Sequence, residues 1–144
     1  MKPKKEKERS AGFVIVRQSG NSWEVLGLRV WGKIDIPKGH VERGESDLDA
    51  ALRECQEEAG INVSSSDMMW GDRHFVSERP HKDVVVYIAI TDQEPEILMN
   101  PETKQYEHDG YHWMTWDEMR RRCYPYLLGA INWAQSVVEN RQQT

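Results

Sequence analysis

Short runs of apolar residues, separated by polar turns, divide much of the chain into predicted strands. Residues 11–17 and 23–30 are rich in β-branched and other large apolar side chains, and the Gly20-Asn21 turn between them predicts a hairpin. Residues 83–91 are apolar at successive positions, which is typical of a central strand buried on both faces. Weaker strand patterns occupy residues 68–77, 96–99 and 111–115.

A helical pattern is strongest between residues 46 and 60. Its apolar residues recur every three or four positions, Ser46 is suited to cap the start, and Gly60 is suited to end the helix in a left-handed conformation. Two further helices are predicted at residues 116–122 and 124–140. Strands around one internal helix, followed by a closing helix, predict an α/β fold arranged as an α/β/α sandwich.

Composition narrows the class of protein. The length of 144 residues predicts one domain over residues 10–144, preceded by a flexible charged tail at residues 1–9. The net charge of −5 disfavours a nucleic-acid backbone as partner, and no apolar run is long enough to cross a bilayer. Cys55 and Cys123 are too few for a disulfide framework, which favours a reducing cytoplasm.

Three carboxylates share one face of the predicted helix at residues 46–60. Glu54, Glu57 and Glu58 stand at positions i, i+3 and i+4, so a helix brings them together. Close anions repel one another, and a hard divalent cation such as Mg²⁺ relieves that repulsion. The alternative is an ordinary charged helix surface without a ligand.

The residues around these glutamates fall into a fixed spacing. Gly39 is followed by Glu45, then by Arg53-Glu54, Glu57-Glu58 and Gly60-Ile61. This spacing resembles the Nudix box, the loop–helix–loop catalytic motif of hydrolases that act on nucleoside diphosphates linked to another group. The resemblance implies a Nudix-type α/β/α sandwich with a mixed β-sheet.

The resemblance also assigns roles within the box. Glu54, Glu57 and Glu58 would hold Mg²⁺, with Mn²⁺ as an alternative, together with a loop carbonyl at Lys38 or Gly39. Arg53 would pair with a box glutamate, for which Glu45 is the expected partner.

Flanking residues extend the resemblance toward one subgroup. The run Pro37-Lys38-Gly39-His40-Val41-Glu42, the strand at residues 82–89 and the pair Glu107-His108 are similar to the asymmetrical diadenosine tetraphosphate hydrolases. This implies cleavage of diadenosine tetraphosphate to ATP and AMP. Glu107 would then be a further metal ligand or the general base, a role for which Glu54 is the alternative. The loop at residues 100–105 is longer than this resemblance predicts.

A dinucleoside polyphosphate also needs contacts to its phosphates and bases. Lys38, His40 and Lys82 are candidates for the phosphates, and Tyr87 and Tyr111 are candidates for stacking on adenine. The alternative for the basic side chains is a solvated surface, and for the aromatic side chains a place in the core.

Two other functions stay open from the sequence. A Nudix hydrolase could act on ADP-ribose, a capped RNA 5′ end or a damaged nucleoside triphosphate, with the capped RNA disfavoured by the acidic charge. A Nudix fold could also bind a small-molecule nucleotide without cleaving it, although such a module would be expected to lose the box glutamates. The sequence leaves the oligomeric state open.

Overall fold

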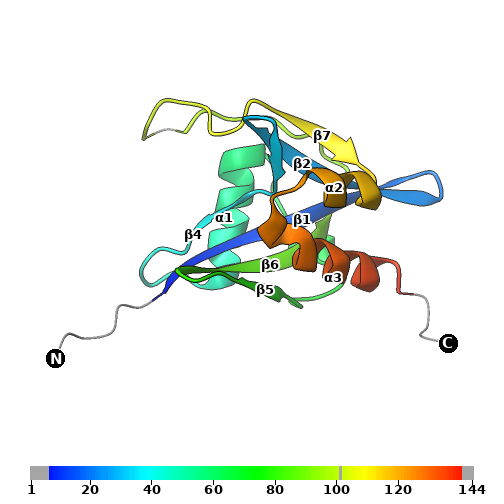
Figure 1. The fold of residues 1–144 in the computed structure, drawn as a ribbon, viewed down its shortest axis with the longest axis horizontal. Helices are drawn as coiled ribbons and strands as arrows, with labels where there is room; N and C mark the ends of the chain where they lie inside the picture. The colour runs from blue at the N-terminus through cyan, green and yellow to red at the C-terminus, as the bar shows by residue number, and fades with distance from the viewer. Residues whose placement is uncertain (1–6, 101, 141–144) are drawn as a thin grey trace.

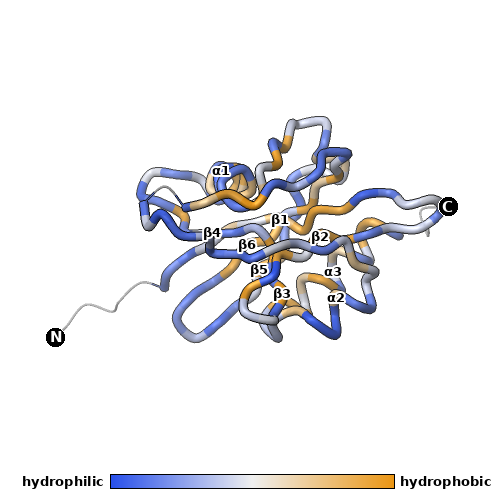
Figure 2. The backbone as a smooth tube through the Cα atoms, turned by 90° about the horizontal axis from the view of Figure 1, so that it is seen from above, coloured by the Kyte–Doolittle hydropathy of each residue, from blue (hydrophilic) through white to orange (hydrophobic). Residues whose placement is uncertain are grey.

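The computed structural model describes residues 7–100 and 102–140 as three layers, with one mixed sheet between helices (Figures 1 and 2). Helix α1 covers one face of the sheet, and helices α2 and α3 cover the other (Figure 2). The predicted α/β/α sandwich is therefore confirmed. The strands are β1 (Glu8–Ser19), β2 (Ser22–Val30), β3 (Lys33–Asp35), β4 (Lys38–His40), β5 (Phe75–Glu78), β6 (Lys82–Ile90) and β7 (Gly110–Met114). The helices are α1 (Asp47–Ala59), α2 (Trp116–Arg122) and α3 (Leu128–Val138), with short 3₁₀ turns η1 (Ser65–Asp67) and η2 (Pro125–Leu127).

Strand β1 organises the sheet. It runs parallel to β6 along one edge, and along its other edge it pairs antiparallel with β4 in its first half and with β2 in its second half. The order is β3-β2-β1-β6-β5, with β7 also paired to β2. This order brings β4 beside the start of β1, where the chain enters the loop before α1.

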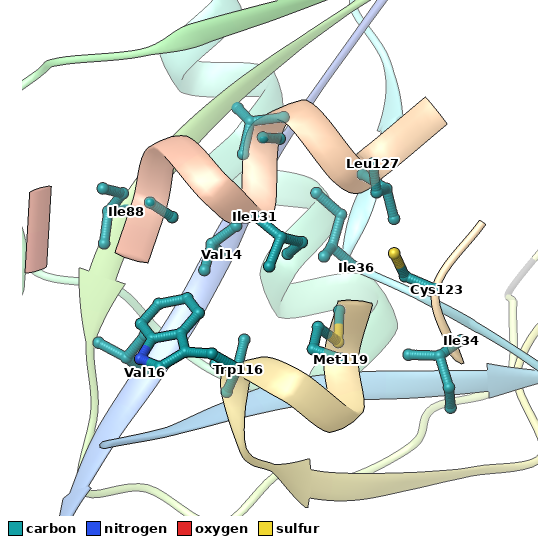
Figure 3. Packing of buried hydrophobic residues seen from close by; sticks show 14 of the residues in the cluster. Val14, Val16, Ile34, Ile36, Ile88, Trp116, Met119, Cys123, Leu127 and Ile131 are labelled. Atoms are coloured by element: carbon teal, nitrogen blue, oxygen red, sulfur yellow. The ribbon is translucent and has the colours of Figure 1, made fainter. Parts of the chain in front are cut away.

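Alternation along the central strands supplies two cores. In β1, Phe13 and Ile15 face the layer with α1, whereas Val14 and Val16 face the layer with α2 and α3 (Figure 3). Both faces of β1 are buried, and so are both faces of β6, as its continuous apolar pattern predicted.

Helix α1 begins and ends where the sequence indicates. The Ser46 hydroxyl accepts a hydrogen bond from the Asp49 N–H at 3.0 Å, and Gly60 ends the helix with a left-handed φ of 67°. Ala51, Cys55 and Ala59 are buried against the sheet, which leaves the glutamates at the opposite and flanking positions.

Four elements differ from the sequence prediction. Glu8 and Arg9, assigned to the tail, belong to β1 because they pair with Lys82 and Asp83 of β6; residues 1–6 lie outside the described part. The strand predicted at residues 68–77 is confined to β5, and no strand forms at residues 96–99. The last helix begins only at Leu128, after η2.

Among the described residues, no helix has the length and apolarity needed to cross a membrane.

Candidate active site

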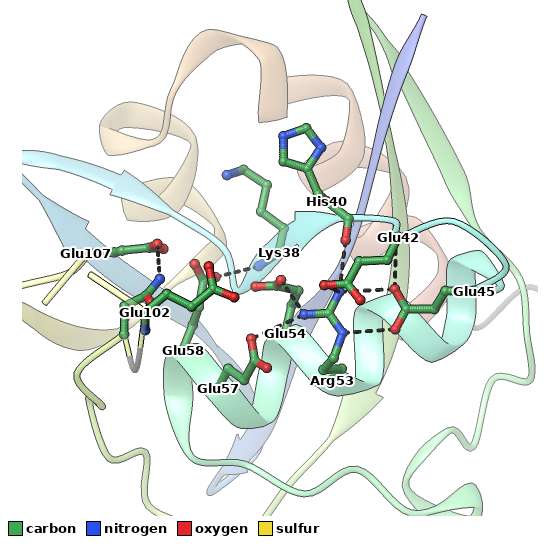
Figure 4. Close-up of polar contacts among 11 residues, drawn as sticks. Lys38, His40, Glu42, Glu45, Arg53, Glu54, Glu57, Glu58, Glu102 and Glu107 are labelled. Atoms are coloured by element: carbon green, nitrogen blue, oxygen red, sulfur yellow. Dashed lines mark hydrogen bonds and ion pairs between the residues drawn. The ribbon is translucent and has the colours of Figure 1, made fainter. Parts of the chain in front are cut away.

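The box glutamates project from α1 toward β4 (Figure 4). Glu58 accepts a hydrogen bond from the backbone N–H of Lys38 at 2.8 Å, which ties the helix to the strand. The side chain of Glu54 is 14% exposed, whereas that of Glu57 is 42% exposed. Burial raises the pKa of Glu54, and it raises the pKa of Glu58 still further above the usual range. The carboxylates are therefore crowded and poorly solvated without a counter-ion.

Gly39 makes room for one of these carboxylates. A Cβ atom placed on Gly39 would lie only 2.1 Å from the carboxyl carbon of Glu54. A real Cβ cannot approach so closely, so any larger residue at this position would force the Glu54 carboxylate to move. The first glycine of the predicted motif is thus explained by the packing of β4 on α1.

Arg53 holds the glutamates on this face in place. Its guanidinium makes a bidentate pair with Glu45 at 2.9 and 3.0 Å, and it also donates to Glu54 at 2.8 Å and to Glu57 at 3.2 Å. A further bond reaches the backbone carbonyl of His40 at 2.9 Å. The hydrogen bond to Arg53 lowers the pKa of Glu45, and that to Glu45 raises the pKa of Arg53. The expected Arg53–Glu45 pair is present, and it connects the loop before the helix to the helix itself.

Glu107 joins the box from the loop before β7. Ligand atoms of Glu58, Glu107 and His108 all lie within 4.8 Å of one another, and Asn100 donates to Glu107 at 2.9 Å. Burial and a hydrogen bond to Glu107 raise the pKa of Glu58, and the same bond lowers the pKa of Glu107, so Glu58 keeps a proton more readily than Glu107 does. Burial lowers the pKa of His108, which favours its neutral, ligating form.

Sequence reasoning missed His108 and Asn100 as members of this group. His108 adjoins Glu107 in the chain, and that adjacency was the available signal. Asn100 gave no signal, because it lies in the loop whose length departs from the resemblance.

Lys38 is held by a partner that the sequence analysis also missed. Its Nζ lies 3.1 Å from the Oδ2 of Asp35, a buried carboxylate. The Oδ1 of Asp35 accepts bonds from the Tyr126 hydroxyl and from the Ile36 N–H, both at 2.8 Å. Burial opposes the charged form of Lys38, but Asp35 and Glu58 outweigh it and raise the pKa of Lys38.

One cavity of about 350 Å³ unites most of the predicted residues. Lys38, His40 and Lys82 line it together with the acidic groups. The pKa of Lys82 is lowered by burial and by the nearby positive charge of Lys38. The predicted residues that line this cavity are Lys38, Gly39, His40, Arg53, Glu54, Glu57, Glu58, Lys82 and Glu107.

Tyr87 and Tyr111 lie elsewhere. The alternation of β6 directs Tyr87 into the core beneath α1, where it is 6% exposed and its ring contacts Phe13 and His74. Tyr111 is half-buried against the same core. Neither lines the glutamate cavity, so the structure does not bring the two predicted stacking residues to the carboxylates.

This set of donors fits a divalent metal ion. The carboxylate oxygens are the ligands that Mg²⁺ prefers, they converge on one cavity, and burial without a counter-ion disfavours the charged form of Glu58. Basic side chains that line the same cavity suit an anionic ligand.

Comparison with known families agrees with this geometry. A family model described as the NUDIX domain matches residues 5–133. The chain belongs to the Nudix family.

Individual proteins of known name are similar to this chain in sequence. This Nudix chain is 40% identical over 86 residues to the asymmetrical bis(5′-nucleosyl)-tetraphosphatase of Rattus norvegicus, covering 57% of this chain and 55% of that protein. It is 31% identical over 121 residues to the Caenorhabditis elegans protein of the same name, covering 77% and 79%. The chain thus spans about half the length of the mammalian relative (55%).

A solved structure supports the fold. The crystal structure of a C. elegans Ap4A hydrolase binary complex aligns with a TM-score of 0.72 at 21% identity, covering 92% of this chain and 98% of that one. At this identity the match concerns the fold alone. The Nudix resemblance carried by the box residues is confirmed by the family match.

Proposed function

We propose that this protein is a Mg²⁺-dependent hydrolase of dinucleoside polyphosphates, with diadenosine tetraphosphate as the preferred substrate and ATP and AMP as products. The observation that carries the proposal is the cavity in which box carboxylates and Glu107 face Lys38 and Lys82. A polyphosphate needs both features, because its charge must be neutralised and its chain must be held. The sequence likeness to the asymmetrical tetraphosphatases supports the choice of substrate.

The acidic side of the cavity would hold the metal. Glu57 and Glu58 are the principal proposed ligands, joined by whichever of Glu54 and Glu107 does not act as the base. The Gly39 carbonyl is a backbone contributor, and Mn²⁺ could substitute for Mg²⁺. A bound divalent cation neutralises phosphate charge and makes a water more nucleophilic.

The side chains of the protein would then position the substrate and accept a proton. Lys38 and Lys82 bind phosphate oxygens, and His40 lies beside them. Glu54 is the favoured general base because burial raises its pKa above the usual range and Arg53 fixes its orientation. Glu107 is the alternative base.

A substrate panel tests the proposal. The protein would be incubated with diadenosine tetraphosphate, ADP-ribose, capped RNA and oxidised nucleoside triphosphates, with and without Mg²⁺, and products separated by chromatography. We expect the highest kcat/KM for diadenosine tetraphosphate. A clear preference for ADP-ribose or capped RNA would replace the substrate but keep the Nudix chemistry, and nucleotide binding without any turnover would indicate a binding module.

We also propose a cytoplasmic location. The support is that Cys55 and Cys123 are both free, buried thiols, as is usual in a reducing compartment.

A further inference from the structure

Trp31 occupies a position that the fold itself does not explain. It lies in the turn between β2 and β3 with a φ of 51°, followed by Gly32 with a φ of 82°. Two successive residues of positive φ favour asparagine, aspartate or glycine, and a bulky side chain adopts this conformation rarely. The side chain is also 92% exposed, so it adds little to the core. Neither the turn nor the packing accounts for a tryptophan here.

Tyr106 is a second exposed aromatic residue at the same place. It is 59% exposed and immediately precedes Glu107. Trp31 and Tyr106 line a cavity of about 110 Å³, whose other walls include Glu107 and His108. Those two residues also line the recess beside Glu54, Glu57 and Glu58. The aromatic cavity therefore adjoins the carboxylate group directly.

Few large apolar side chains are strongly exposed among the described residues, and the two aromatic ones lie together. Within residues 7–100 and 102–140, the large hydrophobic side chains that are most exposed are Trp31, Met69, Met99, Tyr106 and Leu128. The two aromatic members of this set both lie at the one cavity beside Glu107. Trp31 and Tyr106 thus supply two exposed rings at a cavity that Tyr87 and Tyr111 do not line.

We propose that Trp31 and Tyr106 form a nucleobase subsite, in which the base of a nucleoside polyphosphate stacks while its phosphates extend toward Lys38 and Lys82. The inference rests on the proposed function, since it assumes a nucleotide in the main cavity. A neutral, planar ring suits this subsite because aromatic faces stack on every base.

The surrounding charge excludes an anion as the occupant of the subsite. Glu107 and Asp109 are on its walls, and Arg29 is already paired with Asp109 at 2.9 Å. Among the described residues, the lining of the aromatic cavity has no lysine or arginine that could hold a phosphate, whereas the main cavity has Lys38 and Lys82. This difference orients the nucleotide, with its base at Trp31 and its phosphates at Lys38 and Lys82.

The test compares substitutions that keep or remove the aromatic face. Trp31→Leu and Tyr106→Leu retain apolar bulk without a stacking surface, whereas Trp31→Phe and Tyr106→Phe retain the ring. Each variant would be measured for kcat/KM on diadenosine tetraphosphate, and for the Kd of ATP and of inorganic triphosphate with Mg²⁺. Met69→Leu changes an exposed apolar residue away from both cavities and serves as control.

We expect each leucine variant to lose about tenfold in kcat/KM and in ATP affinity, with the phenylalanine variants close to wild type. Inorganic triphosphate has no base, so its Kd should stay the same in every variant. Melting temperatures should match wild type, because both side chains are exposed. ATP affinity unchanged in the leucine variants, or an equal loss for inorganic triphosphate, would overturn the subsite.

The Kd values of ATP and inorganic triphosphate test the subsite independently of the hydrolysis reaction. If wild type hydrolyses no dinucleoside polyphosphate but Trp31→Leu weakens ATP and not inorganic triphosphate, the subsite stands and the proposed reaction fails. If wild type hydrolyses diadenosine tetraphosphate and the leucine variants do so equally well, the reaction stands and the subsite fails.

Discussion

The contact between Gly39 and Glu54 shows how one missing side chain shapes the site. The carboxyl group of Glu54 fills the space where a Cβ atom would stand, at 2.1 Å. We expect Gly39→Ala to push this carboxylate away and to lower kcat by about 100-fold, since small displacements of reacting groups cost rates of that order. Steady-state kinetics on diadenosine tetraphosphate would measure the effect.

Gly71→Ala is the matched control for Gly39→Ala. A Cβ on Gly71 meets no atom within 4 Å, although its φ of 79° adds backbone strain. Its variant should lose some stability but keep its turnover. Equal turnover in the two alanine variants would show that Gly39 is not needed for the position of Glu54.

Glu107 lies outside the box, so its role is a separate prediction. We expect Glu107→Gln to lower kcat by about 10²- to 10⁴-fold, because it removes either a metal ligand or a proton acceptor. The amide is nearly isosteric and the side chain lies in a surface loop, so the melting temperature should change little. Glu78→Gln, an exposed carboxylate at the end of β5, should behave as wild type. Near-normal turnover by Glu107→Gln would remove this residue from the site.

At the scale of elements, η2 is linked to β3 and β4 through one chain of hydrogen bonds. Tyr126 donates to Asp35, and the second oxygen of Asp35 pairs with Lys38. We expect Tyr126→Phe to raise the KM for diadenosine tetraphosphate several-fold, because Asp35 would no longer hold Lys38 in one orientation. The free energy of unfolding should fall by about 1–2 kcal/mol, as is usual for a lost buried hydrogen bond.

Tyr124→Phe is the comparison for that prediction. Its ring stacks on that of Tyr126 with centroids 6.2 Å apart, so the substitution keeps the aromatic contact and removes only a hydroxyl that is not part of the Asp35 chain. KM should stay at the wild-type value. An equal rise of KM in both variants would show that η2 affects the cavity through general packing and not through Asp35.

Local signals explain which elements the sequence could predict. Helix α1 was predictable because its spacing, its Ser46 cap and its Gly60 end all act within the helix. The extent of β5 was not predictable, because Gly71 and the turn around it interrupt the apolar run. Only pairing with β6 defines where this strand lies. Pairing with β6 likewise draws Glu8 and Arg9 into β1.

The same reasoning explains which site residues could be predicted. Glu54, Glu57, Glu58 and their Arg53–Glu45 support lie within one short segment, whose spacing was informative. Tyr126 and Asp35 are 91 residues apart, so only the fold brings them together. Strand alternation showed that β6 has two buried faces, but it could not tell that Tyr87 faces α1 instead of the cavity.

For the molecule as a whole, metal binding should couple stability to pH through Glu58. Its pKa in the folded protein is raised by burial and by the hydrogen bond with Glu107, so this carboxyl group holds a proton more readily than an exposed glutamate. A raised folded-state pKa stabilises the metal-free protein below the ordinary glutamate range, and this contribution is lost as pH rises through the raised value. Mg²⁺ must displace that proton, so the stabilisation by Mg²⁺ should grow with pH.

Thermal unfolding checks this coupling. We expect the increase in Tm on adding Mg²⁺, relative to EDTA, to be larger at about pH 8 than at about pH 5.5. Because Tm with Mg²⁺ is compared with Tm in EDTA at the same pH, the effect on Tm of groups that titrate far from the metal drops out. Glu58→Gln should lose both the increase and its pH dependence. A Tm increase that is the same at both pH values would contradict a raised pKa of Glu58 at the metal site.

The central claim is that this Nudix chain uses its carboxylate cavity to hydrolyse diadenosine tetraphosphate. The most direct measurement is a timed incubation of that substrate with the purified protein and with Glu58→Gln, each with Mg²⁺ or EDTA, followed by chromatographic quantification of nucleotides. The account predicts ATP and AMP in equal amounts from wild type with Mg²⁺, and almost none from the variant or in EDTA. Intact substrate after prolonged incubation with wild type and Mg²⁺, or turnover that survives Glu58→Gln, would contradict it.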